Sequence, residues 1–140
     1  MGTYLNRLDV TPQTDGKIWV VLAPFGYRTD GGVYVIVPLG FRTNFVSVPR
    51  VFWSFISPWG DHGFGAVVHD WLYWDQPMSQ KEADGVILEA MKQSGVGAIK
   101  RYTIFRALRI FGRFAWKENQ QRRSGGENRV GPIPTTPPNP

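Results

Sequence analysis

Residues 67–84 read VVHDWLYWDQPMSQKEAD and place ionisable side chains inside an otherwise apolar run. His69 and Tyr73 are four residues apart, so a helix puts them on one face. Asp70 points about 100° away from His69 on the same helix. The stretch therefore predicts two polar groups that point in different directions from one helix, which must also bury apolar surface.

A second helix follows the short DQPM break and should return antiparallel to the first. Asp84 lies on its stripe with Ile87 and Met91, which predicts that the carboxylate faces inward. A buried carboxylate needs hydrogen-bond donors, and His69 and Tyr73 are the donors at hand. A carboxylate that fixes the tautomer of a histidine leaves the other ring nitrogen free as a general base. Such a network can also serve only to hold two helices together.

The first third of the chain predicts β structure. The segments KIWVVLAPF (17–25) and GVYVIVPLGF (32–41) are rich in β-branched and aromatic residues. Between them, residues 30–32 form an Asp-Gly-Gly turn signal, which favours a hairpin. Pro24 and Pro38 should mark strand ends or a sheet edge.

Helices should make up the middle of the chain. Ser47 can cap a short helix that ends at Pro58. Ser79 and Glu82 form a Ser-x-x-Glu capping box at the start of the second of three longer helices. These longer helices are expected over residues 61–74, 79–94 and 98–119. The third is amphipathic and carries many basic side chains.

This order predicts an α+β fold: an N-terminal β-hairpin or small antiparallel sheet packed on an antiparallel helix pair, then the basic amphipathic helix and an extended Pro-rich tail. Residues 1–119 should form a single globular domain, and residues 120–140 an extended Gly/Pro-rich arm. Such an arm can dock on neighbouring subunits at low entropic cost. Its candidate contact residues are Arg122, Arg123, Arg129, Pro132, Pro134 and Pro137.

The chain has 140 residues, a formal net charge of +5 and no cysteine, so neither disulfides nor thiolate chemistry are expected. The sequence shows no signal peptide and no apolar run long enough to span a membrane. Basic residues gather late in the chain, where they can attract phosphates, lipid headgroups or an acidic protein, or simply be solvated. A nucleic-acid partner is not expected, because no recognised binding motif is present.

Four blocks in order carry a resemblance over most of the folded part: LGFRTNFVSVPR (39–50), AVVHDWLYW (66–74), SQKEADGVILEAM (79–91) and YTIFRALRIFGRFAW (102–116). They resemble a domain family of unknown function that is common in bacteriophages and prophages. That family usually has Asp where this chain has Asn44. The resemblance implies a virion protein, made in the host cytoplasm, that assembles with copies of itself or with other virion proteins.

A second, local resemblance starts from His-Asp-x-x-Tyr followed by Asp on the next helix, which is similar to secretory phospholipases and the phospholipase domain of parvovirus capsids. It implies that His69 activates a water, that Asp70 binds Ca²⁺, and that Tyr73 and Asp84 support His69. The secretory enzymes have disulfides and a Gly-rich calcium loop, and this chain has no cysteine and no clear match to that loop. A zinc site at His62 and His69 is disfavoured because two helical turns, roughly 10 Å, would separate them.

Two functions are therefore expected. The first is a structural or assembly component of a phage virion, in the tail, baseplate or neck. The second is a small Ca²⁺-dependent hydrolase, phospholipase-like or directed at another envelope ester, with His69 as general base. The basic third helix would suit an anionic membrane surface. An open cleft at His69 would favour the enzyme, and a sealed site would favour the structural role.

Overall fold

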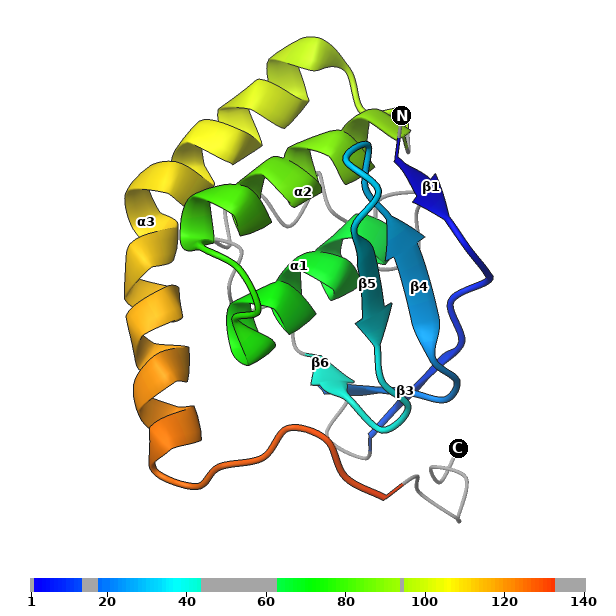
Figure 1. Ribbon diagram of the computed structural model, residues 1–140, viewed down its shortest axis with the longest axis vertical. Helices are drawn as coiled ribbons and strands as arrows, with labels where there is room; N and C mark the ends of the chain where they lie inside the picture. Colours follow the sequence, from blue (N-terminus) through cyan, green and yellow to red (C-terminus); the bar gives the residue numbers. More distant parts are fainter. Residues whose placement is uncertain (1, 14–17, 44–62, 94, 133–140) are drawn as a thin grey trace.

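The computed structural model describes residues 2–13, 18–43, 63–93 and 95–132. Within these residues two small antiparallel sheets come first and three helices follow, which confirms the α+β prediction. Helix α1 (Gly63–Asp75) lies in the middle of the molecule in Figure 1. The strands lie on one side of it, and α2 (Gln80–Gln93) and α3 (Ala98–Ser124) lie on the other. None of the described helices combines the length and the apolar character that crossing a membrane requires.

Each described sheet has three strands. The first has the order β1-β4-β5 and consists of β1 (Thr3–Tyr4), β4 (Phe25–Arg28) and β5 (Tyr34–Val37). The second has the order β2-β3-β6 and consists of β2 (Val10–Pro12), β3 (Trp19–Val21) and β6 (Arg42–Thr43). Along β5, Val35 and Val37 are buried whereas Tyr34 and Ile36 are exposed. This alternation is expected for a strand with one face on the core.

The predicted hairpin is present, but its first strand differs from the expected one. β4 pairs with β5, with Phe25 opposite Val37, around a turn in which Gly32 has a φ of +81°. The segment 17–25 was expected as one strand, but it is broken just before β4, and its first part is β3 of the other sheet. Pro24 explains the break, because proline has no N–H to donate to a ladder.

The three longer helices are present, with some ends shifted. Ser79 caps α2, as predicted, because its hydroxyl accepts a hydrogen bond from the N–H of Glu82 at 3.2 Å. Helix α3 continues to Ser124 instead of ending at Asn119, so the first residues of the expected arm are helical. The ion pair between Glu118 and Arg122 supports this last part of the helix. The short helix expected from Ser47 lies outside the described residues.

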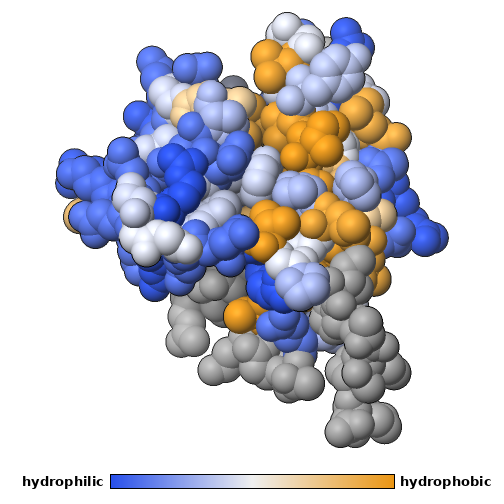
Figure 2. Space-filling view, turned by 60° about the horizontal axis from the view of Figure 1, so that its bottom comes forward, coloured by the Kyte–Doolittle hydropathy of each residue, from blue (hydrophilic) through white to orange (hydrophobic). Residues whose placement is uncertain are grey.

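The main core lies between α1 and the inner faces of the sheets, and a second cluster joins α2 to α3 through Ile87, Met91, Ile104 and Leu108. Other apolar side chains are exposed. Figure 2 shows a gathering of them on the side of the strands, whereas the end of α3 is hydrophilic. Exposed apolar residues on and near the strands include Leu5, Leu22, Ile36 and Leu39. Large exposed patches of this kind are typical of interaction surfaces.

Candidate functional site

Asp84, on α2, is fully buried and binds side chains from the two other helices. Tyr73 donates a hydrogen bond from Oη to Oδ1 of Asp84 at 2.6 Å, and His69 Nε2 lies 3.3 Å from the same oxygen. Arg109, on α3, donates from Nη1 to Oδ2 at 2.9 Å. Gln80 donates from Nε2 to Tyr73 Oη at 3.2 Å. We call these five residues the Asp84 cluster.

The electrostatics of this cluster keep Asp84 ionised. Burial on its own would raise the pKa of Asp84, but the hydrogen bonds from His69, Tyr73 and Arg109 outweigh burial and hold that pKa below its usual value. Burial and the hydrogen bond to the carboxylate raise the pKa of Tyr73, so its phenol stays protonated as a donor. The cluster is therefore a carboxylate held by three donors.

His69 is fully buried and stacks against Tyr73, with 4.1 Å between the ring centroids. Because the Asp84 carboxylate can only accept, we place the imidazole proton on Nε2. That tautomer leaves Nδ1 as an acceptor, and Nδ1 has no hydrogen-bond partner among the described residues. The ring thus has the orientation that a general base needs, but its side chain has no exposed surface.

Asp70 points away from the Asp84 cluster, toward the sheet and the C-terminal segment. Thr43, on β6, donates from Oγ1 to Oδ2 of Asp70 at 2.6 Å. The guanidinium of Arg129 donates from Nη2 to Oδ2 at 2.8 Å and from Nη1 to Oδ1 at 3.3 Å. Both side chains of this ion pair are largely buried. We call Thr43, Asp70 and Arg129 the Asp70 cluster.

Arg129 makes further contacts that fix it in place. Its Nε and Nη2 donate to the backbone oxygen of Arg42 at 3.0 and 2.7 Å. Its guanidinium carbon also lies over the rings of Phe41 and Trp74, 4.9 and 5.4 Å from their centroids. Arg129 therefore combines a bidentate ion pair, backbone hydrogen bonds and cation–π contacts, which makes it a specific anchor.

Residues 129–131 lie along the edge of the second sheet and meet it through a single β-bridge; we call them the arm strand. The N–H of Arg42 donates to the carbonyl of Arg129 at 2.8 Å, and the N–H of Gly131 donates to that of Gly40 at 3.1 Å. Val130 faces Phe41 across this antiparallel bridge. A Cβ on Gly40 would lie 2.2 Å from the carbonyl oxygen of Gly131, so the approach requires glycine. The segment runs along the bottom of Figure 1, beside β6.

Among the described residues, those around Asp70 do not fit a calcium ion. Ca²⁺ takes six to eight oxygen ligands, whereas both carboxylate oxygens of Asp70 already accept from Arg129, and one of them also from Thr43. A cation would also have to lie against the guanidinium. Elsewhere in the described ranges, no group of three or more His, Asp or Glu side chains could hold a metal. Asp70 therefore has a structural partner where the sequence suggested a metal ligand.

The other residues expected in the arm have separate contacts. Arg122 pairs with Glu118 on α3, and Arg123 donates to the backbone oxygens of Trp74 and Asp75 at the end of α1. The carbonyl of Pro132 accepts from Arg42 Nη2 at 3.3 Å. Some residues named from the sequence lie outside the described residues: Asn44, Ser47, Pro58, His62, Pro134 and Pro137.

Sequence reasoning missed three members of these clusters: Thr43, Gln80 and Arg109. Thr43 is part of the block LGFRTNFVSVPR (39–50), but nothing in the sequence pairs that block with Asp70. Arg109 follows Leu108, which lies on the buried stripe of α3. A basic residue at the border of a buried stripe is a usable signal for a partner to an inward carboxylate.

The comparisons with known proteins identify a family. No curated protein and no solved structure matches the chain. A family model described as "Protein of unknown function (DUF1353)" matches residues 19–108, which is more than half of the chain. The match runs from β3 to Leu108 in α3 and includes Thr43, Asp70 and most of the Asp84 cluster. The chain belongs to the DUF1353 family.

Proposed function

We propose that this chain is a structural and assembly component of a bacteriophage virion, in its tail, baseplate or neck, and that its C-terminal arm docks on neighbouring subunits. The virion setting rests on the resemblance of the four sequence blocks to a family common in phages. The observation that carries the assembly role is the arm strand, which is held on a sheet edge by Arg129 and by main-chain hydrogen bonds.

The arm strand has the features of an exchangeable segment. It is short, it follows Gly125 and Gly126, and Gly126 has a φ of +95°. Its main-chain pairing with the sheet edge can form equally well with an identical arm from a second copy. Exchange therefore loses no contact of the Asp70 cluster and links neighbouring subunits.

The burial of the ionisable residues supports a structural role for both clusters. His69 and Asp84 have no exposed side-chain surface, whereas a working general base needs room for a water and a substrate carbonyl. Each cluster instead joins elements that are distant in the sequence. The Asp84 cluster connects the three helices, and the Asp70 cluster connects α1, β6 and the arm strand.

The test is the mass of the purified protein by light scattering over a range of concentrations. We expect the full chain to form larger assemblies as concentration rises, and a chain ending at Gly126 to stay monomeric. Arg129→Ala, which removes the anchor of the arm strand, should also shift the protein toward monomer. Its control is Lys117→Ala, which removes an exposed positive charge from α3 and should assemble like wild type. Mass spectrometry of purified virions should find the protein. A full chain that is monomeric at every concentration and absent from virions would overturn the proposal.

A hydrolase is the second candidate, and one observation favours it: Nδ1 of His69 has no described partner, while Nε2 is held by Asp84. In such an enzyme His69 would take a proton from water at Nδ1, and Asp84 would stabilise the imidazolium. The test of the hydrolase measures fatty-acid release from phospholipid vesicles. Wild type and His69→Ala are each incubated with the vesicles, once with Ca²⁺ and once with a chelator. Fatty-acid release that the folded variant lacks would support the hydrolase, and no release from wild type would reject it.

A further inference from the structure

Helix α3 exposes a row of apolar and basic side chains on the side away from the core, which we call the outer face. Its exposed apolar members include Ile99 and Phe114, which are 87% and 63% exposed. Such exposure is unusual for large apolar residues that recur at helical spacing. The outer face consists of Ile99, Tyr102, Arg106, Ile110, Arg113, Phe114 and Lys117.

The charged residues of the outer face are all positive. Helix α3 contains eight basic residues and one acidic residue, Glu118, which already pairs with Arg122. Arg109 and Arg123 are used inside the molecule. Arg106, Arg113 and Lys117, in contrast, make no hydrogen bond or ion pair with any residue in the described part of the chain. These three cations are therefore available to an external anion.

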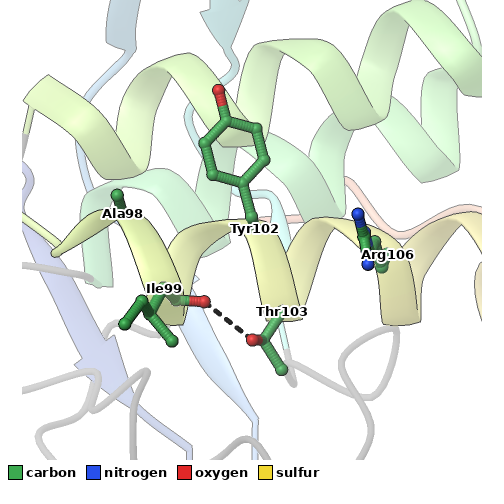
Figure 3. A pocket seen from close by; sticks show the side chains of 5 residues that line it. All are labelled: Ala98, Ile99, Tyr102, Thr103 and Arg106. Carbon is green, nitrogen blue, oxygen red and sulfur yellow. Dashed lines mark hydrogen bonds between the residues drawn. The ribbon is translucent and has the colours of Figure 1, made fainter.

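The N-terminal part of this face is a shallow hollow, lined by Ala98, Ile99, Tyr102, Thr103 and Arg106 (Figure 3). Thr103 donates its hydroxyl to the backbone oxygen of Ile99 at 2.7 Å, so its hydroxyl is turned back onto the helix. The polar group of Thr103 is thus already satisfied by the helix itself. The hollow therefore combines apolar surface with a single cation, Arg106.

We infer that the outer face of α3 binds an anionic phospholipid surface. Interspersed apolar and basic side chains on one helix face suit the interface of such a membrane, where rings and aliphatic groups enter the acyl boundary and cations meet the headgroup phosphates. A second copy of the same face would bring like charges together. Duplex DNA would engage the cations but leave Ile99, Ile110 and Phe114 in water. This inference does not depend on the proposed virion role.

The experiment is cosedimentation of the full chain with vesicles of phosphatidylcholine alone, or of phosphatidylcholine and phosphatidylglycerol in equal parts. We expect binding to the mixed vesicles only, weakened by added salt. Replacing Arg106, Arg113 and Lys117 by Gln should weaken binding on the order of a hundredfold. The control removes the same charge elsewhere, as Arg28→Gln, Lys81→Gln and Lys92→Gln, and should keep most of the binding.

A double variant, Ile110→Ser and Phe114→Ser, distinguishes insertion of apolar side chains into the membrane from attraction between charges alone. This pair keeps every charge and changes only exposed side chains, so the fold should survive; thermal unfolding checks this. The inference requires the pair to weaken binding to mixed vesicles by tenfold or more, on the order of the loss of two buried apolar side chains. Binding that the pair leaves unchanged, no binding to mixed vesicles, or a preference for duplex DNA over vesicles would each overturn it.

Discussion

His69 and Asp70 are adjacent in the sequence but belong to different networks. His69 faces Asp84 and the other helices, whereas Asp70 faces Thr43 and Arg129. The helix turns about 100° between them, so one dipeptide serves two sides of α1. Each carboxylate that these networks bury has a guanidinium partner, and this is what allows two charged groups to lie in the core.

Replacing Asp84 with Asn should destabilise the protein. The change removes the negative charge that faces Arg109 and weakens the hydrogen bonds from His69 and Tyr73. Loss of one partner from a buried pair costs about 3–5 kcal/mol, and the partial exposure of Arg109 puts this case nearer to about 2–3 kcal/mol. Thermal or urea unfolding measures it, with Glu127→Gln, which removes an exposed carboxylate outside the helices, as control. Equal stability of both variants would contradict the prediction.

Because the pKa of Asp84 is lowered in the folded protein, the stability of the protein should depend on pH. A carboxylate whose pKa is lower in the folded state than its ordinary value of 3.8 stabilises the fold fully above that ordinary value. This contribution is lost as pH falls through the lower folded pKa, where Asp84 takes up a proton. The stability difference between wild type and Asp84→Asn should therefore be constant near neutral pH and shrink below about pH 4. A difference that stays constant into acid would show that charge is not the cause.

At the scale of elements, Gly112 lets α3 lie close to α1. A Cβ at this position would lie 2.3 Å from Tyr73 Oη and 3.2 Å from Gln80 Nε2. Gly112→Ala should therefore destabilise the fold by about 1–3 kcal/mol through overpacking, although alanine is the better helix former. Gly85→Ala on α2 is the matched control, because nothing lies within 4 Å of its added Cβ, and it should stabilise slightly. Equal melting-temperature shifts for both would refute the packing argument.

The sequence predicts best those features whose cause lies within a single helix or turn. The Asp84 stripe and the Ser79 cap arise within one helix, and spacing alone located them. β3 pairs with β2 and β6, and no periodic pattern in the sequence indicates which segments will pair. Strands of two or three residues are also too short to show the alternation of apolar and polar residues that identifies a strand. Likewise, no pattern in the sequence indicates that Asp70 pairs with Arg129, which lies 59 residues away.

At the scale of the whole molecule, Arg129 connects the C-terminal segment to the sheet and to α1. Arg129→Ala would leave Asp70 buried with only Thr43 as a partner. We expect a loss of about 3 kcal/mol, and adding Asp70→Asn should restore part of it by removing the unpaired charge. Hydrogen exchange locates the effect: in Arg129→Ala the amides of Arg42 and Gly131 should lose protection, while those of α2 keep it. If those two amides stay protected, the arm strand is held by its backbone pairing alone and Arg129 is not its anchor.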